Sequence, residues 1–342
     1  MTRLLAVRLD SLGDMLVTGP GIRAMAAGGA AVTVLAGPRG ATAARLLPGV
    51  EDVLVWSCPW IDARPGPVEA VDVRGLVERV RAGAFDAAVV FTSFHQSPLP
   101  TALVLRLAGV PWVGAISEDY PGSLLDLRHR VEEDLPEPVR ALSLASAAGW
   151  PAAAGDDARL RVRAALPPIA HLVADRPYVV VHPGASVPAR AWPEQQWAEA
   201  VTELVADGWE VVVTGSPDER GLSSRVAGIH GIDLSGRTPL PELAAVLSGA
   251  SAVVVANTGP AHLAAAVGTP VVSLFAPTVP AVRWAPYGVP VALLGDQQAP
   301  CRDTRAAHCP VPGHPCLMSV TPADVAAAVV QLTVNDFCEE VR

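Results

Sequence analysis

The chain has 342 residues, 51% of them hydrophobic, and carries a net charge of −9 in which every one of the 25 basic residues is arginine. This length allows about two domains that each bury a core. The acidic balance argues against nucleic acid as a partner. No apolar run approaches the roughly 20 residues that a transmembrane helix needs.

Short apolar runs alternate with helical patterns from the start of the chain, a pattern typical of βαβ units and a parallel sheet. In the first half we predict strands at 4–9, 31–36, 52–56, 87–91 and 112–116, separated by helices at 14–27, 41–47, 68–81 and 99–108. Most residues of these strands are apolar, which predicts that helices cover both faces of the sheet.

The second half repeats the scheme. Strands are predicted at 178–181, 210–214, 252–255 and 270–275, and helices at 192–206, 218–227, 240–247 and 260–267. A proline-rich linker is predicted at 164–177. The expected fold class is α/β, with two Rossmann-like, doubly wound parallel-sheet domains facing across a cleft. Their expected extents are 1–166 and 167–321, followed by a C-terminal helix at 322–342 that can pack back on the N-terminal domain.

The loop after the first strand, Asp10-Ser11-Leu12-Gly13-Asp14, has two interpretations. Aspartate is favoured at helix N-termini, so Asp10 or Asp14 can simply cap the next helix. Alternatively, Asp14 lies at the ligand-binding end of the sheet and acts as a general base toward a hydroxyl group.

Two loops in the second half could hold a phosphorylated ligand. After strand 178–181, Ser186 and Arg190 could form a phosphate cradle, because a guanidinium group matches phosphate oxygens. In the segment GSPDER, Glu219 could bind ribose hydroxyls. Alternatively, it simply occupies the first turn of a helix, where the helix dipole favours an acidic residue.

The segment after strand 252–255 reads Asn257-Thr258-Gly259-Pro260 and then enters a helix of small residues. Proline is accepted in a first helical turn, and Gly259 allows a ligand to approach the backbone. The free amide groups of a helix N-terminus favour a phosphate there. His262, one turn into this helix, either packs in the core or faces the ligand.

In this order, DSLGDM, HPGAS, GSPDER and NTGPAHLAAAVGTPVVSLFAPT resemble the ADP-heptose:lipopolysaccharide heptosyltransferases, glycosyltransferase family 9. The resemblance implies a GT-B fold with an N-terminal acceptor domain and a C-terminal donor domain. It also implies an inverting, metal-independent transfer from an ADP-sugar, in the family ADP-heptose. It makes Asp14 the general base, with donor contacts from Ser186, Arg190, Glu219, Asn257, Thr258, Gly259 and His262.

One position departs from the family. Asn257 stands where aspartate is usual, which leaves open the identity of the donor and the activity itself. A sugar-nucleotide epimerase on the same scaffold and a non-catalytic nucleotide-sugar binding protein are the alternatives. A nicotinamide-dependent oxidoreductase is disfavoured, because no G-x-G-x-x-G follows the first strand.

The remaining expectations concern partners, metals and location. Cys301, Cys309 and Cys316 lie in a tail whose spacing differs from that of zinc motifs, so no metal and no cofactor are expected. The acceptor is a glycolipid, a saccharide or a small metabolite, bound by N-terminal loops such as 92–98, 117–122 and 128–130. The expected location is the cytoplasm, with contact at the inner face of the membrane left open.

Overall fold

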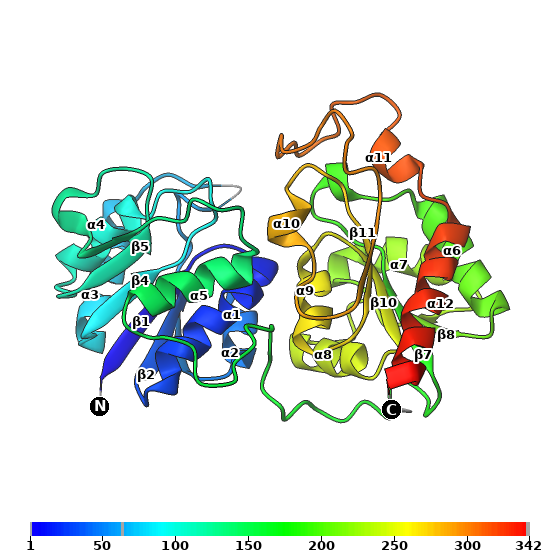
Figure 1. Ribbon diagram of the computed structural model, residues 1–342, viewed down its shortest axis with the longest axis horizontal. Helices are drawn as coiled ribbons and strands as arrows, with labels where there is room; N and C mark the ends of the chain where they lie inside the picture. Colours follow the sequence, from blue (N-terminus) through cyan, green and yellow to red (C-terminus); the bar gives the residue numbers. More distant parts are fainter. Residues whose placement is uncertain (1, 63–64, 340–342) are drawn as a thin grey trace. The chain divides into compact units, whose positions relative to one another are not determined.

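The computed structural model describes residues 2–62 and 65–339. Its contacts divide the chain into two compact units, 1–163 and 164–342 (Figure 1). The division falls at the first residue of the predicted linker. Each unit contains its own six-stranded sheet, in which every pair of neighbouring strands is parallel.

The N-terminal sheet has the strand order β3-β2-β1-β4-β5-β6. Its central strand β1 pairs with β2 and with β4, so that Leu4 lies between Val32 and Ala87. The side chains of β1 and β4 are almost all buried, as expected for strands covered on both faces. The strands are β1 (Arg3–Arg8), β2 (Ala31–Ala36), β3 (Val50–Val55), β4 (Ala87–Val90), β5 (Val113–Ile116) and β6 (Leu127–His129).

Helices from the described part of the unit flank this sheet. Helix α1 packs on α2, α5 and strands β1–β3, whereas α3 contacts α4 (Figure 1). Gly21 permits the close approach of α1 to α5, because a Cβ atom there would lie 2.8 Å from the carbonyl oxygen of Ala141. The helices are α1 (Leu12–Ala27), α2 (Ala41–Leu46), α3 (Ala70–Gly83), α4 (Leu99–Leu107), η1 (Gly122–Leu124) and α5 (Glu137–Ala147).

The C-terminal sheet has the order β12-β11-β10-β7-β8-β9. Strands β7 and β10 are neighbours at its centre, with Val181 opposite Val254. Their side chains are buried throughout. The strands are β7 (Tyr178–His182), β8 (Glu210–Val213), β9 (Ile232–Asp233), β10 (Ala252–Ala256), β11 (Val271–Leu274) and β12 (Val291–Leu294).

Helices also flank this second sheet. One group contains α6, α7 and α12, and α12 contacts strands β10–β12; another contains α8 and α9. Val325 and Val329 of α12 join the same buried cluster as Trp197 of α6. The helices are η2 (Pro188–Arg190), α6 (Glu194–Ala206), η3 (Pro217–Glu219), α7 (Arg220–Ala227), α8 (Leu240–Ser248), α9 (Gly259–Ala266), α10 (Ala281–Trp284), α11 (Pro315–Met318) and α12 (Pro322–Glu339).

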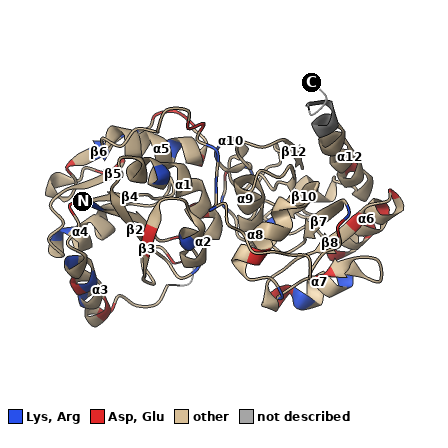
Figure 2. Ribbon diagram, turned by 90° about the horizontal axis from the view of Figure 1, so that it is seen from below, with Lys and Arg blue, Asp and Glu red and all other residues tan. Residues whose placement is uncertain are grey.

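Charged side chains are distributed unevenly over these elements. Figure 2 shows both signs of charge along α3, whereas α9 carries no charged residue. Within the two described stretches, no helix combines the length and the apolar character needed to cross a membrane.

Candidate functional site

The two sheets share one strand order, which creates an equivalent position in each. Counted within its own half, each sheet runs 3-2-1-4-5-6, so the order reverses between the first and fourth strands. Ligands of such sheets bind beyond the carboxyl ends of the strands at this switch point. In the N-terminal unit the switch point lies between β1 and β4, and in the C-terminal unit between β7 and β10. Most of the predicted site residues follow one of these four strands.

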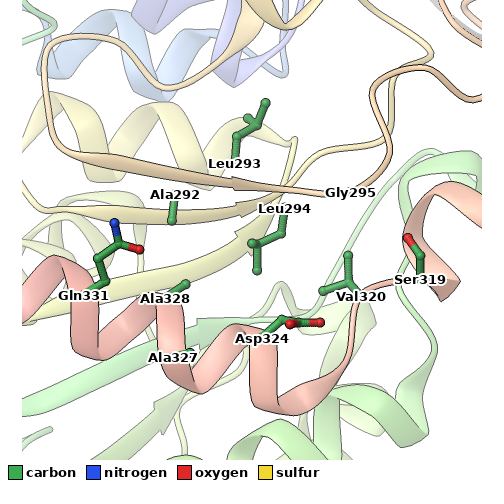
Figure 3. Close-up of a pocket in the computed structure, with 10 residues that line it drawn as sticks. All are labelled: Ala292, Leu293, Leu294, Gly295, Ser319, Val320, Asp324, Ala327, Ala328 and Gln331. Atoms are coloured by element: carbon green, nitrogen blue, oxygen red, sulfur yellow. The ribbon is translucent and has the colours of Figure 1, made fainter.

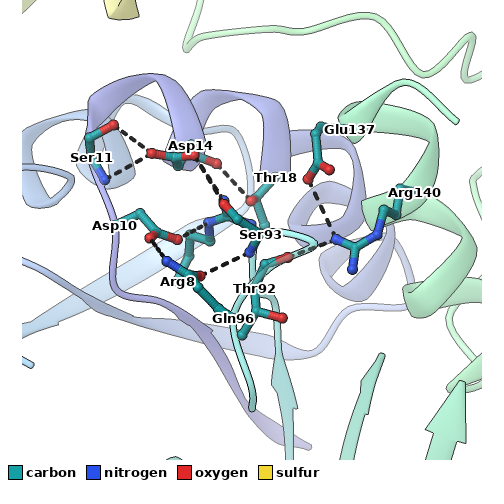
Figure 4. Close-up of polar contacts among 10 residues, drawn as sticks. All are labelled: Arg8, Asp10, Ser11, Asp14, Thr18, Thr92, Ser93, Gln96, Glu137 and Arg140. Atoms are coloured by element: carbon teal, nitrogen blue, oxygen red, sulfur yellow. Dashed lines mark hydrogen bonds and ion pairs between the residues drawn. The ribbon is translucent and has the colours of Figure 1, made fainter. Parts of the chain in front are cut away.

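Asp14 is tightly held at the N-terminal switch point (Figure 4). Its Oδ2 accepts hydrogen bonds from the amide of Ser11, at 3.2 Å, and from the hydroxyl of Ser11, at 2.6 Å. Its Oδ1 lies 3.0 Å from Nη2 of Arg8, and the side chain remains 18% exposed. Asp14 therefore takes part in the N-terminal cap of α1, as one interpretation of the sequence held, and also keeps access to solvent.

Arg8, the last residue of β1, is the buried cation of this switch point. Its Nε lies 2.8 Å from Oδ2 of Asp10, and its Nη2 also donates to the hydroxyl of Ser93, at 2.8 Å. Burial is the largest single influence on Arg8 and lowers its pKa, but the combined attraction of the neighbouring carboxylates, chiefly Asp10 and Asp14, outweighs it, so that the pKa is raised. Burial is the largest influence on Asp10 and raises the pKa of its carboxyl group, against the attraction of Arg8.

The loop after β4 completes the network (Figure 4). Gln96 donates from Nε2 to Asp10 and accepts the amide hydrogen of Ser93, at 3.0 Å. This loop belongs to the 92–98 segment that the sequence named for acceptor binding. Arg140 of α5 donates to the carbonyl oxygen of Thr92, at 2.7 Å, and lies 3.5 Å from Glu137. Arg8, Glu137 and Arg140 were not singled out from the sequence, because the folded chain alone brings them to this point.

At the C-terminal switch point, Arg190 and Asn257 come together. Nη1 of Arg190 donates to the backbone oxygen of Asn257, at 3.3 Å, which links the loop after β7 to the loop after β10. Ser186, in the same loop as η2, is exposed to solvent. The fork of Arg190 therefore lies beside the turn that leads into α9, and Ser186 remains accessible on the loop that carries it.

Asn257 is buried and has a structural role. Its Nδ2 donates to the carbonyl oxygen of Ala276 and its Oδ1 accepts from the amide of Ala276, both at 3.3 Å. Thr258 has an extended backbone, as expected for the residue before a helix, and α9 begins at Gly259. His262 is buried one turn into this helix. The asparagine side chain thus fixes the turn that presents the N-terminus of α9.

Glu219 follows β8 and folds over the loop after β7. Its Oε2 accepts the amide hydrogen of Ser216, at 2.7 Å, and lies 4.0 Å from Nε2 of His182. A Cβ atom at Gly184 would come within 2.1 Å of Glu219, so the contact requires glycine. Nδ1 of His182 is 2.9 Å from the hydroxyl of Thr214. Burial lowers the pKa of His182, and the charge of Glu219 opposes this in part.

The cysteine tail contains Cys301 and Cys316, both buried, and the half-buried Cys309. Burial, followed by the neighbouring thiols of Cys301 and Cys309, raises the pKa of Cys316 to about 11. Across residues 2–62 and 65–339, no group of three or more His, Cys, Asp and Glu side chains is arranged to hold a metal ion.

A separate pocket of about 490 Å³ lies between β12 and α12 (Figure 3). Its lining combines alanine, leucine and valine residues with the polar residues Asp324, Ser319 and Gln331. None of the residues predicted for catalysis or donor binding contributes to it. The pocket therefore gives no support to the site at the switch points.

Known proteins resemble this chain in sequence and in fold. The model of glycosyltransferase family 9 (heptosyltransferase) matches residues 73–313. Lipopolysaccharide heptosyltransferase 1 of Pseudomonas aeruginosa is 39% identical over 129 residues, 36% of this chain and 36% of that protein. The matched part thus spans little more than a third of that relative's length.

Two solved structures are similar over nearly the whole chain. E. coli ADP-heptose lps heptosyltransferase II has a TM-score of 0.74 and 20% identity, covering 98% of this chain and 99% of that one. E. coli heptosyltransferase WaaC with ADP has a TM-score of 0.70 and 20% identity, covering 97% and 100%. At this identity the likeness concerns the fold, and it confirms the predicted class, two Rossmann-like domains of the GT-B type.

Proposed function

The chain belongs to glycosyltransferase family 9, and on that premise we propose that it transfers a heptose or a related sugar from an ADP-sugar to an acceptor hydroxyl group. The observation that carries the proposal is the convergence of Arg190, Asn257 and the start of α9 at one switch point. A guanidinium group and free helical amides are the groups that a diphosphate requires.

ADP is the proposed leaving group. The solved structure of WaaC, which shares this fold, is described as a complex with ADP. In the present chain, Arg190, the free amides of the first turn of α9 and His262 would stabilise the negative charge that develops on the diphosphate. These protein groups can supply the positive potential by themselves, so we propose a transfer that needs no metal ion. Ser186 and Glu219 would add contacts to the phosphate and the ribose.

Asp14 is the proposed general base. The acceptor hydroxyl would give its proton to the carboxylate while its oxygen attacks the anomeric carbon of the donor. The bond from that carbon to the diphosphate oxygen would break, and its electron pair would leave with ADP. Attack opposite to the leaving group inverts the configuration. The partial exposure of the Asp14 side chain supports this role, because a fully buried carboxylate could not receive a proton from a ligand.

The acceptor is proposed to be a glycolipid, a saccharide or a small metabolite, and the reaction is placed in the cytoplasm or at the inner face of the membrane. The test is incubation of the purified protein with ADP-heptose and a panel of these acceptors. We expect ADP release only in the presence of an acceptor, a product of inverted anomeric configuration by NMR, and no loss of rate with EDTA. Conversion of the ADP-sugar into an epimeric ADP-sugar without any acceptor would instead favour an epimerase.

A further inference from the structure

The guanidinium group of Arg8 makes its contacts at the switch point of the N-terminal unit. Nε pairs with Asp10, while Nη2 contacts both Asp14 and the hydroxyl of Ser93, at 3.0 Å and 2.8 Å. The side chain is only 2% exposed, whereas that of Asp14 is 18% exposed. The cation is therefore buried more deeply than the carboxylate that it contacts and offers almost no surface to a ligand. Figure 4 shows the contacts between them.

A purely stabilising role explains this arrangement poorly. Removing two charges from water costs about as much free energy as their attraction returns, so a buried ion pair contributes little net stability. What the network provides is orientation. Arg8 fixes one oxygen of Asp14 from the protein interior, and Ser11 fixes the other through two hydrogen bonds. Both oxygens of the carboxylate are thus held, while 18% of the side chain stays exposed.

We propose that Arg8 is a positioning residue, which acts through Asp14 by holding its carboxylate in the orientation and charge state that accepts the acceptor's proton. The inference rests on the proposed function of Asp14 and adds to it the residue that prepares the base. A planar fork is needed, because one guanidinium group must reach Asp10 in one direction and Asp14 with Ser93 in another. The ammonium group of lysine is a single point charge and cannot span both.

Several charged groups surround this cation. Asp10 and Asp14 face it from the β1–α1 segment, and Glu137 acts on it from α5. Arg39, in the β2–α2 loop, acts on Asp10, and Arg140 of α5 pairs with Glu137. Arg8 is the member that contacts both aspartates directly. Loss of its charge should therefore make Asp14 harder to keep ionised, despite the more distant arginines.

The test compares Arg8→Lys and Arg8→Met with the unaltered protein. We expect kcat to fall by about tenfold or more in Arg8→Lys, since a small misplacement of a reacting group is costly, and further in Arg8→Met. ADP affinity measured by calorimetry should not change, because the donor residues lie in the other unit. In Arg8→Met the acidic limb of the kcat–pH profile should move to higher pH, since the base loses its positive neighbour.

Arg23 supplies the matched control. It lies on α1, as Asp14 does, and makes two hydrogen bonds to Asp156, at 2.7 Å and 2.6 Å. Arg23→Lys should lower thermal stability without changing kcat or the pH profile. Native kcat and a native acidic limb in Arg8→Lys and Arg8→Met would overturn the proposal.

The remaining outcomes are also decisive. If Arg8→Met does not fold, Arg8→Lys carries the test. If neither variant folds, Arg8 is a residue of the folded core, and the proposal fails. An unaltered protein that neither binds ADP nor transfers sugar refutes the proposed function itself, a result distinct from any change confined to the Arg8 variants.

Discussion

Asn257 and Ala276 form a closed pair of hydrogen bonds in which the side-chain amide of the first both donates to and accepts from the backbone of the second. This pair joins the end of β10 to the segment that follows β11. Only an amide side chain of this length can satisfy a carbonyl oxygen and an amide hydrogen together. The asparagine that departs from the family's usual aspartate thus has a physical reason within this chain.

Asn257→Asp is therefore expected to lower the stability of the fold, although it introduces the residue that is usual in the family. The carboxylate would face the carbonyl oxygen of Ala276 without a hydrogen to donate, and the free energy of unfolding should fall by about 1–3 kcal/mol. Urea unfolding measures this change. Asn257→Asp with unaltered stability and higher transfer activity would show that the position serves the donor and not the turn.

Asp14→Asn should abolish most of the transfer while leaving ADP binding intact. The amide keeps the size of the side chain but cannot take up a proton, and loss of a general base costs about 10²-fold or more in rate. Steady-state kinetics and calorimetry separate the two effects. Asp156→Asn, which breaks the Arg23 pair in the same unit, is the control that should lose stability only. Near-native turnover in Asp14→Asn would show that Asp14 caps α1 and is not the general base.

Arg190→Ala should weaken the binding of ADP. A hydrogen bond between a charged group and a phosphate is worth about 1.5–3 kcal/mol, which calorimetry resolves easily. Arg225→Ala is the control in the same unit, because this arginine pairs with Glu194 on the surface. Equal ADP affinities for the two variants would show that Arg190 does not bind the donor.

His182 should make the protein less stable on acidification. Burial lowers the pKa of folded His182 below the ordinary value of 6.5. As the pH falls below that value, the unfolded chain takes up a proton that the folded chain does not, so the free energy of unfolding decreases. His182→Gln should reduce the loss seen by urea unfolding between about pH 7.5 and 5.5. The exposed His230→Gln serves as control; an identical pH dependence in His182→Gln would contradict the assignment.

The sequence predicted the nine strands that carry long apolar runs, and it missed β6, β9 and β12. Each of these three lies at an outer edge of its sheet, and none of their residues is fully buried. In β6 and β9, which have three and two residues and contain charged side chains, the apolar run that reveals a central strand is absent. The same reason does not apply to β12, whose four residues are all apolar. Helix α5 was also missed, and with it Glu137 and Arg140.

The candidate site was predictable in part. Loops after parallel strands converge at one edge of a sheet, so Asp14 and Arg190 could be placed from the strand pattern alone. The buried partners Arg8 and His182 could not be selected in this way. Each is the last residue of a strand, where a polar side chain usually reaches solvent. Their importance depends on contacts with Ser93 and Thr214, which lie 85 and 32 positions away.

The packing of α12 has a consequence for how the protein is made on the ribosome. Residues 1–163 can complete their own sheet as soon as they emerge, and domains generally fold in this order during translation. The second unit completes its sheet with β12 but needs a later helix, α12, to cover it. Val254 of β10 and Val272 of β11 share a buried cluster with Val325 and Val329, so their apolar surface stays uncovered until α12 has been synthesised. A nascent chain halted before residue 322 would therefore have all six strands of the second sheet but would leave apolar side chains exposed where α12 packs, and we expect chaperones or proteases to bind it.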